Sequence, residues 1–175
     1  MKKVILVIAV LFTLCGCNIM DMDNTPKKQV EKFFNSYQIL DKKVLEGIDT
    51  LVEKETNLST EQKDKYRDIL KNHYEKLDYE IKDETINGNN ATVKVEIEVN
   101  DYITTLRELE VYKQNNPDEF DSEIKYQEYR LNALKDSNNR IKYTLFLTLT
   151  KIDNKWTLDT ITDSDEEKIL GIYEY

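Results

Sequence analysis

The single histidine, His73, is the residue best suited to move a proton near neutral pH. It lies on the apolar stripe of a predicted helix, four residues after Ile69 and four before Leu77. Tyr37 and Tyr66 stand on predicted helix stripes as well, where their hydroxyls could face a cavity. A base beside tyrosine hydroxyls and a carboxylate would suit a proton-moving cavity enzyme or a small-ligand carrier. The alternative, which we favour, is that all three are packed core residues.

Other catalytic and metal-binding patterns are missing from the sequence. A Ser-His-Asp hydrolase would need an elbow such as G-x-S-x-G, and no such motif occurs. Both cysteines, Cys15 and Cys17, lie near the start, so the rest of the chain has no thiol nucleophile or thiolate zinc ligand. The acidic run 163–167 lacks the spacing of a calcium loop and suits a helix N-terminus better. We therefore expect no catalytic residue, no metal and no cofactor.

Tyrosine is the most frequent aromatic residue, with 11 in the chain. Four of them fall within a charged stretch at 101–139, namely Tyr102, Tyr112, Tyr126 and Tyr129. Tyrosine is enriched at interfaces because its large rigid ring carries a polar tip. Taken singly, each of them is more easily explained by packing. As a group they predict a contact surface on this stretch.

Length and charge limit the classes of function. The chain has 175 residues, of which 39% are hydrophobic and 34% charged, which is enough for one domain with an apolar core. The net charge of -9 argues against nucleic-acid binding, because that affinity comes from Lys and Arg on phosphates. We expect a protein partner, with a small ligand as the alternative, and no nucleic acid.

The N-terminal segment carries two lysines, an uncharged apolar run over 4–14, and then Leu14-Cys15-Gly16-Cys17. The run is too short to span a bilayer and fits the apolar region of a signal peptide. The pattern resembles a bacterial lipoprotein signal, which implies removal of residues 1–16 and lipid on the Cys17 sulfur. Residues 17–24 would then form the lipidated tether. Lysine far outnumbers arginine, which suggests an AT-rich genome, so we expect the outer face of a Gram-positive cell membrane.

Apolar spacing of three and four residues predicts two N-terminal helices. Thr25 and Pro26 suit the start of the first, whose stripe runs without a break from Val30 to Ile48. Ser59 followed by Gln62 forms a capping box that predicts the start of the second.

Alternation with period two then predicts antiparallel strands. They are expected at 77–81, 91–99, 140–151 and 156–162, with turns at 87–90 and 153–154. Between the second and third of these strands, residues 101–139 are predicted to form a helical insertion. After the last strand, Ser164 with Glu167 resembles a further capping box, which predicts a short helix. The prediction is a single α+β domain over 25–175, with its N-terminal helices on one face of an antiparallel sheet.

Three stretches, 25–34, 86–95 and 149–158, resemble small lipoproteins of the nuclear transport factor 2-like (cystatin-like) superfamily. This resemblance implies a curved sheet that wraps a helix, often around a cone-shaped cavity. Its members include ketosteroid isomerases as well as non-catalytic binding modules, so fold alone does not choose between them. We expect a membrane-anchored, non-catalytic binding or accessory module for an envelope protein. The alternative is a small-ligand carrier or a cavity enzyme of the ketosteroid isomerase type.

Overall fold

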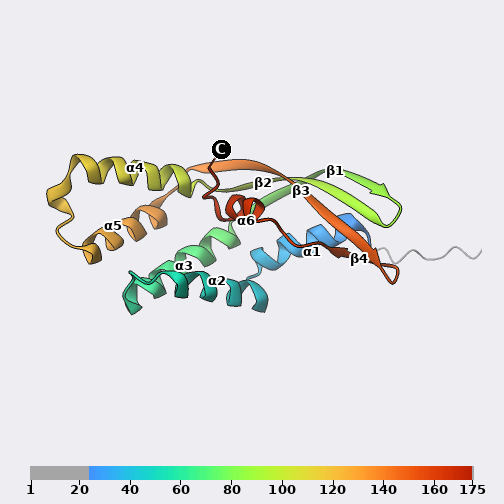
Figure 1. Ribbon diagram of the computed structural model, residues 1–175, viewed down its shortest axis with the longest axis horizontal. Helices are drawn as coiled ribbons and strands as arrows, with labels where there is room; N and C mark the ends of the chain where they lie inside the picture. Colours follow the sequence, from blue (N-terminus) through green and yellow to red (C-terminus); the bar gives the residue numbers. More distant parts are fainter. Residues whose placement is uncertain (1–23, 175) are drawn as a thin grey trace, which may run out of the picture.

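The computed structural model describes residues 24–174, so the predicted signal segment and Cys17 lie outside the described residues. The elements follow one another as α1 (Pro26–Gln38), α2 (Lys42–Lys54), α3 (Thr60–Glu75), β1 (Asp78–Asn87), β2 (Asn90–Asn100), α4 (Tyr102–Asn115), η1 (Pro117–Glu119), α5 (Glu123–Asp136), β3 (Arg140–Ile152), β4 (Lys155–Leu158) and α6 (Asp163–Leu170). This order makes the molecule an α+β protein with an open four-stranded sheet (Figure 1).

The sheet is antiparallel throughout, with strand order β1-β2-β3-β4. Alternate residues of β2 and β3 are buried, and cross-strand pairs such as Val95 with Leu145 and Ile97 with Tyr143 share the covered face. Helices α1, α3 and α6 pack on that face (Figure 1). On the other face, Glu96 pairs with Lys142 at 3.2 Å. One dry and one wet face explain the period of two in the sequence.

The N-terminal helical stretch differs from the prediction, because the expected single helix is two. Leu40 adopts a left-handed backbone conformation with φ 50°. The chain turns there, and the Asp41 carboxylate accepts a hydrogen bond from Val44 N at 2.9 Å to cap α2. The apolar stripe continues across this corner because Leu40 and Val44 both pack against the same core. Hydrophobic spacing therefore conceals the break.

Capping chemistry explains where two further helices begin. The predicted box is present in α3, where the Ser59 and Gln62 side chains each bond the other residue's backbone. The prediction for α6 was wrong by two residues: Thr162, not Ser164, is the N-cap, and its hydroxyl accepts from Asp165 N at 3.1 Å. β4 stops at Leu158 instead of reaching residue 162.

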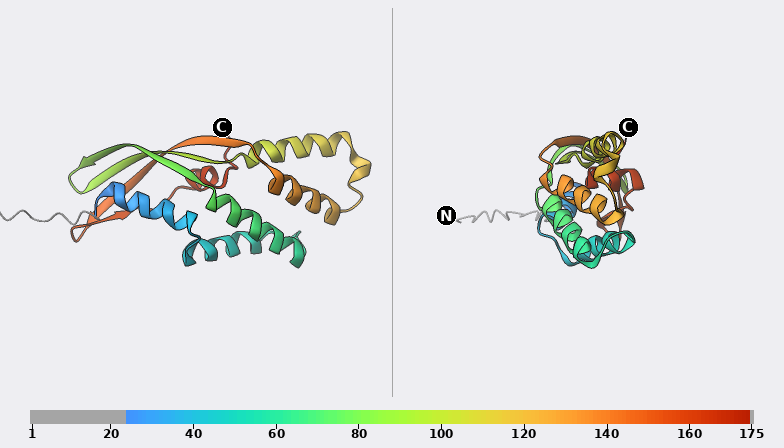
Figure 2. Two further views of the ribbon diagram at one scale, coloured as in Figure 1. Left: turned by 180° about the vertical axis from the view of Figure 1, so that it is seen from behind. Right: turned by 90° about the vertical axis from the view of Figure 1, so that its left-hand side faces the viewer.

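Residues 101–139 form a hairpin of α4 and α5, joined through η1. Its α5 arm packs on α3, where the buried Gln62 side chain donates to Ile124 O at 3.0 Å. Arg130 of α5 also pairs with Glu55, the residue that caps the end of α2, at 3.1 Å. Its α4 arm packs mainly on α5. The hairpin therefore projects from the sheet as an arm that α3 supports (Figure 2).

The chain enters the fold at the end of the molecule opposite the hairpin (Figures 1 and 2). Asn24 is held at the β3–β4 turn, where its amide donates to Asn154 O at 2.8 Å and accepts from Trp156 N at 2.9 Å. Across residues 24–174, no helix combines the length and apolar character that crossing a bilayer requires.

Candidate functional site

His73 is fully buried in α3 and held by its neighbours. Its Nε2 lies 2.8 Å from Ile169 O, and its ring stacks on Tyr102 with centroids 4.8 Å apart. A carbonyl oxygen only accepts, so Nε2 carries the proton, and Nδ1 has no partner among the described residues. Burial lowers the pKa of His73 to about 4, so the ring is neutral at physiological pH.

Tyr37 and Tyr66, the other two predicted cavity residues, lie in different surroundings. The Tyr37 ring meets Tyr74 edge-on at 4.9 Å, and Tyr74 also contacts His73 at 5.3 Å. Burial, reinforced by Glu166 and Asp41, raises the pKa of Tyr37 to about 12. The Tyr66 ring lies 5.6 Å from the Arg130 guanidinium. Tyr74 therefore stands between Tyr37 and His73, while Tyr66 faces the hairpin.

The structure separates the four tyrosines predicted to form a contact surface. Tyr102 is only 3% exposed, because it lies in the first turn of α4 over His73; it packs in the core and is not part of the predicted contact surface. The other three gather with Phe120 at the tip of the hairpin. We call the set Tyr112, Phe120, Tyr126 and Tyr129 the tip cluster.

Ring contacts hold the tip cluster together at the hairpin's far end. Tyr112 and Tyr129 stack with centroids 5.5 Å apart, and Phe120 meets Tyr126 at 5.7 Å and Tyr129 at 5.5 Å. Tyr112 and Tyr129 remain 37% and 43% exposed, and Val111 next to them is 57% exposed. The tip thus presents a partly exposed aromatic surface.

The tip is also acidic. The Tyr112 hydroxyl donates to Glu119 at 2.9 Å, and the Tyr126 hydroxyl donates to Glu110. Residues 117–123 contain four carboxylates and no lysine or arginine. Burial and the nearby Glu110 raise the pKa of Tyr126 to about 12, so its hydroxyl stays protonated.

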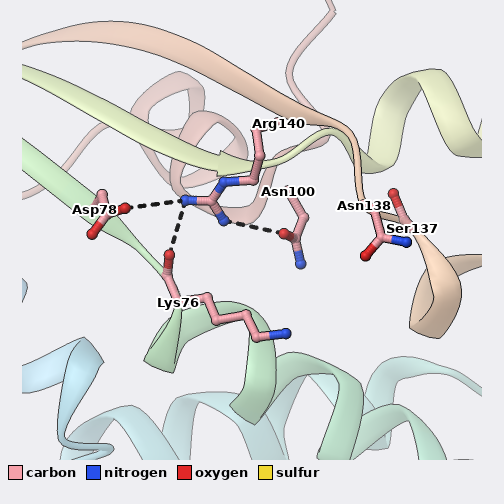
Figure 3. A pocket seen from close by; sticks show the side chains of 6 residues that line it. All are labelled: Lys76, Asp78, Asn100, Ser137, Asn138 and Arg140. Atoms are coloured by element: carbon pink, nitrogen blue, oxygen red, sulfur yellow. Dashed lines mark hydrogen bonds and ion pairs between the residues drawn. The ribbon is translucent and has the colours of Figure 1, made fainter.

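A groove that the sequence did not reveal lies where the hairpin meets α3 and the sheet (Figure 3). Two adjoining cavities of about 370 and 450 Å³ share four lining residues. The shared residues are Lys76, Asn100, Ser137 and Asn138. We call the two cavities together the root groove. Tyr102 lines part of it, whereas Tyr37, Tyr66 and His73 do not.

Arg140, at the start of β3, holds one end of the root groove. Its guanidinium donates to Asn100 Oδ1 at 3.1 Å, to Lys76 O at 2.9 Å and to Glu98 O at 2.7 Å. Figure 3 shows the bonds to Lys76 O and Asn100, which join the end of α3 to the strands, and the ion pair with Asp78 at 3.8 Å. One side chain thereby fixes α3, β2 and β3 relative to one another.

No sequence motif marks the root groove, because its residues come from three separate stretches, 65–78, 100–102 and 135–140. Nor does any part of the described chain bring three or more His, Cys, Asp or Glu side chains into a group that could hold a metal ion. The acidic run 163–167 forms the first turn of α6.

Comparison with known proteins adds one distant likeness. No family model matches the chain, and no curated protein matches it significantly. A solved structure, "a putative lipoprotein (ycdA)" from Bacillus subtilis subsp. subtilis str. 168, is similar at 14% identity with a TM-score of 0.46. The similarity covers 75% of this chain and 46% of that one, so this chain spans less than half of that protein's length.

Proposed function

We propose that this protein is a lipoprotein, anchored through Cys17 to the outer face of a cell membrane, that binds an envelope protein through the tip of its hairpin. The observation that carries the proposal is the placement of the two ends. Asn24 is held at the β3–β4 turn, seven residues after Cys17. The tip cluster lies at the opposite end of the long axis (Figure 1). A lipid at Cys17 would therefore hold the tip away from the membrane.

The chemistry of the tip supports a basic partner. Carboxylates outnumber cations around the exposed rings, where Lys113 lies 3.6 Å from the Tyr126 ring centroid and Lys125 pairs with Asp121 at 3.9 Å. Such a surface matches apolar pockets between lysine and arginine side chains, because opposite charges steer encounter and rings fill pockets. Anionic polymers and lipids would be repelled by the same carboxylates. The tip therefore supports a protein with a basic patch.

The resemblance to the nuclear transport factor 2-like superfamily belongs to the same proposal. Helices that precede an antiparallel sheet and cover one face support it. If the chain has the fold of that superfamily, the α4–α5 hairpin is an insertion between β2 and β3 of the superfamily's core. A non-catalytic role is supported by the packing of Tyr37, Tyr66 and His73 in or against the core, because none of these three side chains lines the root groove.

Photocrosslinking in cells tests the partner. A photoreactive phenylalanine at position 129 should give one discrete protein adduct in the membrane fraction. The same group at exposed Thr148, on the wet face of the sheet, should not. Reversing two charges, with Asp118→Lys and Glu119→Lys, should abolish the adduct. An adduct that survives this reversal, or its absence at position 129, would contradict the proposed surface.

Fractionation tests the anchor separately. Cys17→Ser should release the protein from membranes into the medium, whereas Cys15→Ser should leave it attached. Retention of the Cys17→Ser variant on membranes would show that Cys17 is not the anchoring residue.

A further inference from the structure

The root groove differs in charge from the rest of this acidic chain. It is lined by four cations, Lys65, Lys76, Lys135 and Arg140, and by two carboxylates, Asp68 and Asp78. The whole chain carries -9. A cation-rich concave surface on an acidic protein concentrates anions locally, since low-dielectric walls focus the field. The charge of the groove therefore points to an anionic ligand.

Two of these cations are free to meet a ligand. Lys65 pairs with Glu128, and Arg140 is bonded to the protein as described above. Lys76 and Lys135 make no ion pair or side-chain hydrogen bond among residues 24–174. Figure 3 shows the Lys76 side chain extending from the end of α3 into the space that Asn100 and Asn138 also face. Their ammonium groups can thus be supplied to a ligand without breaking a contact.

The types of donor favour phosphate over carboxylate. A carboxylate is best held by the two parallel N–H groups of an arginine. Here the guanidinium of Arg140 already serves three acceptors in the protein. The remaining cations are lysines, which bind phosphate as point charges. The side chains of Asn72 and Asn138 line the same groove, and the Asn138 amide also donates to Asp136 O at 3.0 Å.

The floor of the groove suits a ligand with a carbon skeleton. Tyr102 and Ile69 line the larger cavity, and both are nearly buried. Its volume of about 450 Å³ is in the range of small-molecule sites. The walls are preformed: Ser137 bonds Thr105 across the hairpin at 2.9 Å, and Asp101 N donates to Asn139 O at 2.8 Å. A preformed site spends little binding energy on ordering.

We propose that the root groove binds a small phosphate-bearing molecule, with its phosphate between Lys76 and Lys135 and its carbon skeleton on Tyr102. This site is separate from the tip cluster and does not depend on the proposed protein partner. The same phosphate chemistry could belong to a free metabolite or to a lipid headgroup, and the experiment distinguishes them.

Calorimetric titration of the full chain, purified from membranes in neutral detergent, tests the site with glycerol 3-phosphate as the probe. We expect saturable binding that weakens at least fivefold when salt rises from about 50 to 200 mM, because ion pairing is screened. Lys76→Gln with Lys135→Gln should weaken it at least tenfold. Lys94→Gln changes an exposed lysine on the wet face of the sheet; it is the matched control and should bind like the parent.

Two further arms assign the source of the phosphate. Glycerate, a carboxylate of similar size, should bind more weakly than glycerol 3-phosphate. Vesicles of phosphatidylglycerol in phosphatidylcholine should compete with the probe if a headgroup is the ligand, and should not if a free metabolite is. The proposal is overturned if glycerol 3-phosphate does not bind at millimolar concentration, or if the double variant melts at the parental temperature and binds as tightly as the parent.

Discussion

Replacing Gly171 with alanine should destabilise this protein far more than the same change at its other glycines. Gly171 follows α6 and adopts a left-handed conformation with φ 73°. An added Cβ would lie well inside 3.0 Å of the Asn100 carbonyl oxygen and 3.4 Å from the His73 ring. The Gly171 carbonyl also accepts from Ile103 N at 2.9 Å, at the start of α4. The close approach of the Gly171 backbone to Asn100 and Ile103 thus holds α6, β2 and the hairpin together.

The size of the effect can be built from two costs. A left-handed backbone costs a residue with a Cβ about 1–2 kcal/mol, and about half of that is offset because alanine restricts the unfolded chain. Moving the backbone of Asn100 away from the new methyl costs a further 1–3 kcal/mol, in line with overpacked cores, and weakening the bond to Ile103 about 1 kcal/mol. The expected loss for Gly171→Ala is about 3 kcal/mol or more.

Two other glycines provide matched controls. Gly88 has a similar φ of 61° but nothing within 4 Å of an added Cβ, so Gly88→Ala should cost about 1 kcal/mol. Gly47 is an exposed position within α2 with equally open space, so Gly47→Ala should stabilise by about 0.5–1 kcal/mol. Gly88→Ala thus measures the cost of the left-handed backbone alone, Gly171→Ala adds the clash of the new methyl with Asn100, and Gly47→Ala has neither cost.

Urea unfolding measures all three. The single tryptophan, Trp156, is buried and provides a fluorescence probe, with far-ultraviolet circular dichroism as a second one. With a slope near 2 kcal/mol per molar, the Gly171→Ala midpoint should fall by about 1.5 M. If Gly171→Ala and Gly88→Ala differ by less than about 0.5 kcal/mol, the close packing at Asn100 does not limit stability and the reasoning fails.

Three further predictions concern His73, Arg140 and Asp41. Burial lowers the pKa of His73 to about 4, so the unfolded chain takes up a proton near pH 6.5 that the folded chain does not. The free energy of unfolding should therefore be highest above pH 6.5 and fall by up to about 3 kcal/mol towards pH 4. His73→Gln should lose that part of the slope in urea unfolding followed across pH, and an unchanged slope would contradict the assignment. Arg140→Lys keeps the charge but cannot donate to three acceptors in one plane, so it should lower the free energy of unfolding by about 1–3 kcal/mol, measured by thermal unfolding. Parental stability would show that the three guanidinium hydrogen bonds are unimportant. Asp41→Ala should cost about 1 kcal/mol by removing the cap of α2, whereas Asp41→Asn should retain most of the stability; equal losses would point to charge and not to capping.

Local chemistry explains which elements could be predicted from the sequence. The capping box at Ser59 and Gln62 predicted the start of α3 because both partners lie within one turn. The alternation along β2 and β3 predicted a sheet with one covered face, because apolar and polar residues alternate where one side of a strand is buried and the other is exposed. The break at Leu40 was missed because its cause is a single left-handed residue inside an unbroken apolar stripe.

The candidate sites were predictable only in part. Clustering of tyrosines pointed to the hairpin, and three of them do meet there, but Tyr102 sits at the first turn of α4, where the chain enters the core. No pattern in the sequence predicted the root groove. Lys76, Asn100 and Arg140 are far apart in the chain and have no common motif.

The sequence by itself determined the helix caps, the strand alternation, the α+β class and the signal-like start, since all of these depend on residues close together in the chain. Tertiary structure alone decided which side chains meet. It buried His73 against Ile169, placed the hairpin tip at the end opposite Asn24, and gathered free lysines from two elements around one groove. The physical reason is that these outcomes depend on how α3, the hairpin and the sheet pack together, and such packing is a property of residues distant in sequence.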